Sequence, residues 1–199
     1  MLWLALVLFI ALTISVLRGG RLVNLGDIEL DAWWLLLIAL GLQVGTGFLP
    51  QSESGESLGL VLVLVSYVLL MLLVWMNRAK PGMWIAGLGV LMNFTVIAIN
   101  GGMPVLAGAA EVASGFTVSQ PDLSGSFKHT ILDETSRLTF FADVIPLRIA
   151  GIGEVISVGD ILLAVGLGAF LEHELRRPRR WFKRGARAQT GSANRPSEL

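Results

Sequence analysis

Residues 58–76, LGLVLVLVSYVLLMLLVWM, form a run of 19 residues without a charge. A helix needs about 20 residues to cross the hydrocarbon core of a bilayer, with a range of roughly 17–25, so this run is long enough to span a membrane. The whole chain agrees, because 54% of its 199 residues are hydrophobic and only 15% are charged. A soluble fold of this length would have too few charges to cover its surface. The sequence therefore predicts a membrane protein.

Four further apolar stretches flank this run. They are residues 1–17, 32–49, 83–99 and 155–171. None shows polar residues repeating on one helical face, as a soluble helical bundle would. The first stretch lacks a basic leader and has no small-residue cleavage site after it, so we expect a span and not a cleaved signal. The predicted fold is all-α, a polytopic membrane helical bundle of about five transmembrane helices.

Lys and Arg residues orient this predicted bundle. With five spans, twelve of the 15 Lys and Arg residues fall on one side, and Lys128, Arg137 and Arg148 remain on the other. Cytoplasmic loops carry the excess of Lys and Arg in membrane proteins. We therefore expect the N-terminus outside and the C-terminus in the cytoplasm, in a bacterial plasma membrane.

Composition also excludes several functions. The formal net charge is zero and the apolar part has no basic stripe, so we expect no nucleic-acid partner. The chain has no Cys, which excludes disulfides, thiol catalysis and thiolate metal sites.

The predicted organisation has four parts. Residues 1–99 form a four-span membrane region, 100–154 an extracytoplasmic loop subdomain, 155–175 the fifth transmembrane helix, and 176–199 a basic, partly disordered cytoplasmic tail. The tail could attract anionic lipids of the bilayer. The 100–154 connection is too long for a structureless loop in a compact protein. We therefore expect an outer-face site, formed by this loop and the start of the last helix, that binds a membrane-protein partner, a peptide or another ligand.

Asp160 is an acid inside the last predicted span. Such an acid costs on the order of 2–3 kcal/mol in the membrane and indicates a functional site by default. A structural alternative exists, because Ser157-Val158-Gly159-Asp160 fits a capping box that places the acid at the positive end of a helix. A further alternative is a small carrier in which Asp160 titrates.

Asp143 lies in an apolar run 17 residues before Asp160. The two acids could meet if residues 146–154 loop back, and one carboxylate could then activate water while the other protonates a scissile amide. Alternatively, Asp143 forms a structural ion pair with Arg137 or Arg148. The first possibility predicts an intramembrane aspartyl hydrolase with an Asp143–Asp160 dyad.

Two asparagines lie on one face of the fourth predicted helix, because Asn93 and Asn100 are seven residues apart. Asn93 is typical of an interhelical hydrogen-bonding residue. Asn100 precedes Gly101 and Gly102, whose exposed backbone N–H groups could hold an oxyanion or a peptide backbone. The same residues could instead form a tight exit turn.

His129 is the remaining candidate binding residue of the outer loop, together with the cap residue Ser157. Its spacing to Asp133 would suit a metal site on a helix, but the other histidine, His173, is predicted to be cytoplasmic. We therefore expect no metal and no cofactor. Gly41-x-x-x-Gly45 and Ala164-x-x-x-Gly168 predict faces at which helices approach closely.

Two family resemblances rest on these motifs. Residues 1–175 resemble a family of small bacterial integral membrane proteins of unknown function, which implies fold and location only. The residues that carry this resemblance are RGGRL at 18–22, Trp33-Trp34, NGGMP at 100–104, ADVIP at 142–146 and SVGD at 157–160. Residues 139–171 are also similar to the last third of lipoprotein signal peptidase, an aspartyl membrane protease. That resemblance implies a catalytic pair of Asp143 and Asp160, with Ser157 where that family has Asn.

Overall fold

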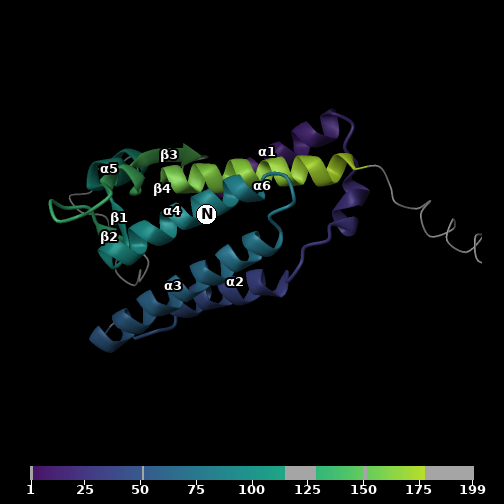
Figure 1. Cartoon of the computed structure of the whole chain (residues 1–199). Coiled ribbons are helices and arrows are strands. Elements are labelled where there is room, and N and C mark those ends of the chain that lie inside the picture. The colour runs from purple at the N-terminus through teal and green to yellow at the C-terminus, as the bar shows by residue number, and fades with distance from the viewer. Residues whose placement is uncertain (1, 51, 115–128, 150–151, 178–199) are drawn as a thin grey trace, which may run out of the picture.

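The computed structural model describes residues 2–50, 52–114, 129–149 and 152–177, and this part of the chain is mostly helical (Figure 1). Its long helices are α1 (Leu2–Leu17), α2 (Trp34–Thr46), α3 (Glu53–Met76), α4 (Met83–Asn100) and α6 (Val158–Arg176). Short helical segments are η1 (Leu22–Asp27), α5 (Ala107–Ser114) and η2 (Thr139–Phe141). Each of the five apolar stretches therefore contains one long helix.

Two of these helices, α3 and α4, are long and apolar enough to cross a membrane, with mean hydropathies of 2.8 and 1.7. At 1.5 Å per residue they measure about 36 Å and 27 Å. The described part of α1 and the whole of α2 are shorter apolar helices. Helix α2 covers only 13 residues of the predicted 32–49 span, because turns occupy both ends of that stretch.

The prediction of an all-α fold is confirmed only in part, because the mostly helical structure also contains two small sheets. Strand β1 (Met103–Val105) pairs in parallel with β2 (His129–Ile131), and β3 (Ile145–Ile149) pairs antiparallel with β4 (Ile152–Ile156). Helix α5 packs on β3 and β4. The predicted span at 155–171 also begins too early, since Val155 belongs to β4 and the helix starts at Val158.

Helices α4 and α6 form the central pair of the bundle (Figure 1). Helix α1 packs on α6, and helix α3 packs on α4. Helix α2 packs mainly on α3. The strands and α5 lie together at one end, which we call the strand end. At the opposite end, the turn end, lie η1, the turn at 77–82 and the C-terminus of α6.

Two pairs of glycines let the backbones of α4 and α6 approach closely. Gly82 lies opposite Gly166, and Gly89 lies opposite Gly159. A Cβ atom on Gly166 would be 2.3 Å from the backbone nitrogen of Ala86, and one on Gly89 would be 2.4 Å from the carbonyl oxygen of Gly159. These positions exclude any side chain, so they fix the antiparallel register of the two helices.

The predicted close approach at Gly41 and Gly45 is wrong. No atom lies within 4 Å of a Cβ built on either glycine, so this face of α2 meets no described neighbour. On α6, a Cβ atom on Gly168 would lie 3.5 Å from the Cβ of Ala11, which is an ordinary contact with α1.

Two buried asparagines hold the turn end together. The Asn24 amide nitrogen donates to the carbonyl oxygens of Leu175 and Arg177, at 2.8 and 2.9 Å. The Asn77 amide binds both the backbone N–H and the carbonyl oxygen of Asp31, at 2.9 and 2.8 Å. Asn24 thereby satisfies carbonyl groups that the end of α6 leaves unpaired, and Asn77 joins the end of α3 to the segment before α2.

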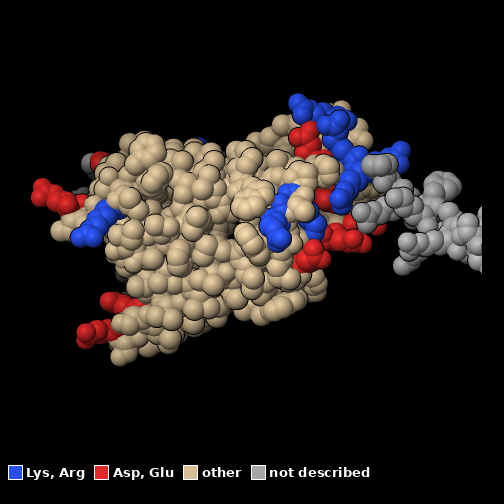
Figure 2. All heavy atoms as spheres, in the orientation of Figure 1, with Lys and Arg blue, Asp and Glu red and all other residues tan. Residues whose placement is uncertain are grey.

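Charged residues lie at the two ends of the molecule. Figure 2 shows Lys and Arg gathered mainly at the turn end, acids at both ends, and a broad uncharged belt between them. Within the described residues, the basic side chains of the turn end are Arg18, Arg21, Arg78, Lys80, Arg176 and Arg177.

Candidate functional site

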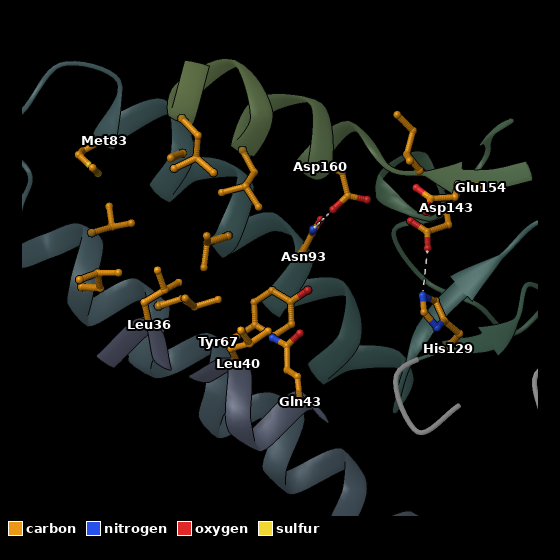
Figure 3. Close-up of a pocket in the computed structure, with 18 of the residues that line it drawn as sticks. Leu36, Leu40, Gln43, Tyr67, Met83, Asn93, His129, Asp143, Glu154 and Asp160 are labelled. Atoms are coloured by element: carbon orange, nitrogen blue, oxygen red, sulfur yellow. Dashed lines mark hydrogen bonds and ion pairs between the residues drawn. The ribbon is translucent and has the colours of Figure 1, made fainter. Parts of the chain in front are cut away.

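A cleft of about 610 Å³ lies between the α2–α3 hairpin and the α4–α6 pair (Figure 3). Most of its length is apolar. Buried residues of α3 and α4 line its floor, namely Tyr67, Leu73, Met83, Ala86 and Val90. The two walls come from α2 and α6, with Leu36, Leu40, Leu163, Leu167 and Phe170.

Polar side chains converge on the part of the cleft nearest the strand end (Figure 3). They come from α2, α3, α4, β2, β4, α6 and the segment before β3. The polar lining residues are Gln43, Tyr67, Asn93, His129, Asp143, Glu154 and Asp160. The cleft is therefore amphipathic along its length.

A closed ring of hydrogen bonds joins α4 to the start of α6. The Ser157 hydroxyl donates to Asn93 Oδ1 at 3.0 Å, and the Asn93 amide donates to Asp160 Oδ1 at 2.8 Å. The Asp160 backbone N–H donates to Ser157 Oγ at 3.0 Å, and the Ser157 N–H donates to Asp160 Oδ2 at 3.1 Å. The predicted capping box is confirmed, and Asn93 adds an interhelical bond to it.

Asp143 is held against the edge of β1. Its backbone N–H donates to the Pro104 carbonyl at 2.9 Å, and its own carbonyl accepts from the Leu106 N–H at 3.0 Å. His129 lies on β2, paired with Met103 on the other side of the same strand. The His129 Nε2 is 3.6 Å from Asp143 Oδ2, and the Asp143 side chain is only 6% exposed.

The structure brings Asp143 and Asp160 to the same cleft. The segment between them folds back as the β3–β4 hairpin, in which Ile145 pairs with Ile156. Asp143 lies two residues before that pair and Asp160 four residues after it. The predicted loop back is therefore present in the form of two paired strands, and the ion-pair partner that the structure shows for Asp143 is His129, which was not the predicted one.

Asn100, Gly101 and Gly102 are not among the described residues that line the cleft. The Asn100 amide nitrogen donates to the Arg137 carbonyl at 2.9 Å, and Asn100 Oδ1 accepts from the Arg137 N–H at 2.8 Å. Asn100 thus holds a peptide backbone, but it is a backbone of the same chain. Gly101 ends α4 with a φ of +71°, a conformation that favours glycine.

Asp133 lies in a turn and not on a helical face with His129. Its Oδ1 accepts from the hydroxyls of Thr135 and Ser136 at 2.7 and 3.0 Å, and from both of their backbone N–H groups. These hydrogen bonds hold the pKa of Asp133 below its ordinary value of 3.8. Among the described residues, no group of three or more His, Asp or Glu side chains could hold a metal ion.

Two cleft residues carried no functional prediction. One is Glu154 on β4. The other is Gln43 of the second apolar stretch, whose amide donates to the Ser66 hydroxyl at 2.9 Å. A Gln within an apolar run is a signal that could have identified this second polar wall.

The chain belongs to a family of unknown function, DUF5317, whose model matches residues 27–171. It is also 34% identical over 166 residues to an uncharacterized protein of Thermotoga maritima. The aligned residues make up 82% of this chain and 87% of that protein. No solved structure matches the chain. The resemblance to an uncharacterised family is thereby confirmed, whereas these comparisons do not show the resemblance of residues 139–171 to lipoprotein signal peptidase.

Proposed function

We propose that this protein is a multi-pass membrane protein that binds an amphiphile in the cleft between the α2–α3 hairpin and the α4–α6 pair. The apolar chain of the ligand lies along α3, α4 and α6. Its polar head lies at the cluster of Asn93, Asp143 and Asp160. The single observation that carries this proposal is the amphipathic cleft itself, with apolar walls along most of its length and polar groups at one end.

A membrane location follows from what the helices expose. Large apolar side chains are exposed along α1 to α4, such as Phe9 at 64% and Leu40 at 57%. Soluble proteins rarely expose contiguous apolar patches of more than a few hundred Å². Between the charged ends of the molecule the belt has no charge on the face in Figure 2, so lipid is the solvent that suits it.

The orientation follows from the basic residues. Because Lys and Arg concentrate on the cytoplasmic side of membrane proteins, the turn end faces the cytoplasm and the strand end faces outward. The polar end of the cleft then lies near the outer surface. Reporter fusions at Asp122, which lies outside the described residues, and at the C-terminus test this topology, and an external C-terminus would overturn it.

The cleft is accessible from the side. Leu36 and Leu40 of α2 line it and are 44% and 57% exposed, and α2 makes no extensive contact with α6. A ligand already dissolved in the bilayer can therefore enter between these two helices without passing through water. Because most of the cleft lining is apolar, it provides no series of polar groups along which an ion could cross the membrane. The geometry therefore favours ligand binding over the carrier alternative.

The test uses the absence of cysteine from the chain. A Leu40→Cys variant places a single thiol on the cleft wall, and Leu37→Cys places one on the same helix outside the cleft with a similar exposure, 55% against 57%. After modification with a bulky thiol reagent, lipid extraction and mass spectrometry measure the amphiphile that remains bound. We expect loss at Leu40→Cys only. Equal retention in both variants would refute binding in the cleft.

A second candidate function is hydrolysis by an aspartyl pair, favoured by the presence of Asp143 and Asp160 in one cleft. In this case the bound amphiphile is a substrate whose scissile amide lies at the polar end. One carboxylate accepts a proton from water as it attacks, and the other, protonated, donates to the leaving nitrogen.

Asp143→Asn and Asp160→Asn test this candidate. If the pair hydrolyses an amide, each variant abolishes turnover of membrane peptides while the protein level remains unchanged and thermal melting shows that each variant is folded. Asp133→Asn is the matched control, because Asp133 is an acid of the same outer region that does not line the cleft. Activity that survives both substitutions would eliminate the hydrolase and leave the binding proposal intact.

A further inference from the structure

We infer that the head group held at the polar end of the cleft is a cation, in particular the ammonium group of a long-chain amine. This inference rests on the proposed function and names the chemical class of its ligand. It follows from the charge that Asp160 brings to the cleft and from the kind of groups that surround it.

The hydrogen-bond donors that the structure shows on the Asp160 carboxylate carry no charge. Its Oδ1 accepts from the Asn93 amide and its Oδ2 accepts from the Ser157 N–H. Both donors are neutral. A carboxylate that is removed from bulk water is costly unless it is paired with an opposite charge. A cationic ligand supplies that charge.

The other ionisable groups of the cleft do not favour an anion. Among the described lining residues these groups are the carboxylates of Asp143 and Glu154, the imidazole of His129 and the phenol of Tyr67. None of those lining residues is Lys or Arg, the side chains that recognise phosphates and carboxylates. When His129 is protonated its charge lies beside Asp143, at 3.6 Å, so the carboxylate of Asp160 remains without a cation.

The first turn of α6 already carries an acid of its own, Asp160, which disfavours an anion there. Helix N-termini bind anions through their unpaired N–H groups and positive dipole. Here the Asp160 N–H donates to Ser157 Oγ, and the Asp160 carboxylate itself occupies the positive end of the helix. A phosphate at this position would lie beside the Asp160 side chain.

The apolar part of the cleft indicates the chemistry of the rest of the ligand, which is a hydrocarbon chain. Met83 and Asn93 both line it and are ten residues apart on α4, so this wall extends about 15 Å along the helix. Phe170 and Leu163 line the facing wall on α6. A long alkyl chain fits this shape, and its amine then lies beside Asp160.

Photoreactive probes test the inference on the intact protein in phosphatidylcholine nanodiscs. Four probes share a hexadecyl chain with a diazirine at its middle and differ in the head group, which is an amine, an alcohol, a carboxylate or a phosphate. Mass spectrometry locates each crosslink, and competition with unlabelled hexadecylamine gives relative affinities. We expect the amine to label cleft residues and to bind about 10–100-fold more tightly than the carboxylate or the phosphate, as for loss of a charged hydrogen bond.

Variants of Asp160 separate its charge from its capping role. Asp160→Asn keeps an acceptor for the cap but removes the charge, and we expect it to lose the preference for the amine. Asp160→Glu keeps both the charge and a capping-box residue, and we expect it to retain the preference. Asp133→Asn is the control for a general change in surface charge, and thermal melting confirms that each variant is folded.

The outcomes distinguish the inference from the proposed function. If the alcohol, carboxylate or phosphate probe labels the cleft as tightly as the amine, the cleft binds amphiphiles but the cationic head is wrong. If Asp160→Asn keeps the preference, Asp160 does not recognise the head group. If no probe labels the cleft above the lipid-exposed helix faces, the proposed function itself fails.

Discussion

Replacing Gly166 by Ala tests whether the contact of α4 with α6 holds the fold together. The new Cβ would lie 2.3, 2.7 and 2.8 Å from the Ala86 nitrogen, the Gly82 carbonyl oxygen and the Ala86 Cα. All three atoms belong to the backbone, so no rotamer change relieves the clash and the helices must move apart. Overpacking costs about 1–3 kcal/mol, and three backbone clashes place this site near the upper value.

Part of that cost is offset, because Ala is better than Gly in a helix by about 0.5–1 kcal/mol. We therefore expect a net destabilisation of about 2 kcal/mol, which corresponds to a melting temperature about 4–8 °C lower for a chain of this size. Thermal melting in detergent, followed by the loss of the monodisperse chromatographic peak, measures it.

Gly41→Ala is the matched control for this prediction. Gly41 is also within a helix, but no atom lies within 4 Å of its Cβ position, so only the gain in helix propensity remains and the melting temperature should stay the same or rise. The reasoning is refuted if Gly166→Ala melts with the wild type, or if Gly41→Ala is destabilised to the same degree.

Three further predictions concern the polar contacts. Asn93→Leu leaves the Ser157 hydroxyl and Asp160 Oδ1 without their side-chain partner, and we expect a loss of about 1–3 kcal/mol. Faster hydrogen exchange at the start of α6 would report it, whereas Thr95→Val, which removes only a bond to the Leu91 carbonyl on the same helix, should have little effect. Asn77→Ala removes both bonds to the Asp31 backbone; proteolysis near Asp31 should become faster, and unchanged protection would contradict the role of Asn77. The pKa of Asp133 is lowered by Thr135 and Ser136, so the stabilisation of this turn is complete above pH 3.8 and is lost as the pH falls through the lower folded pKa. The protection of the turn amides, measured as the exchange rate relative to the intrinsic rate at each pH, should then fall at acidic pH in the wild type, and a protection that is the same at every pH, as in Asp133→Asn, would exclude this origin.

Local signals predicted the helices and one cap. The uncharged run at 58–76 predicts a long apolar helix, and α3 covers it. The Ser157–Asp160 cap was predictable because both partners lie within one turn of the chain. Such features depend on neighbours in sequence, which a single sequence contains.

The strands were missed although one of them carries a pattern. Ile145, Leu147 and Ile149 alternate with other residues at the period of a strand, but Pro146 argues against a ladder strand and the run was too short to stand alone. Strand β1 is only three residues long, and its partner begins at His129. Pairing over that distance is decided by tertiary packing, which no local window reports.

The helix register was missed for a related reason. Small residues four apart were expected to mark close contacts, yet Gly41 and Gly45 contact nothing within 4 Å. The glycines whose Cβ positions meet the backbone of the facing helix are seven apart, at 82 and 89 at the start of α4 and within it, and at 159 and 166 on α6. Their meaning depends on which two helices are partners, and that information is absent from the spacing within either helix.

The cap and the functional role of Asp160 were alternatives at the level of sequence, but the structure makes them compatible. A capping box needs only the bonds between Ser157 and Asp160, and these leave the second carboxylate oxygen available. The Asn93 amide binds that oxygen from α4, and Gly159 permits this approach, since a Cβ there would lie 2.0 Å from Asn93 Oδ1. The carboxylate is thus fixed from two helices at the polar end of the cleft. The bond from Asn93 thus adds an interhelical contact to the cap and leaves both bonds of the cap intact.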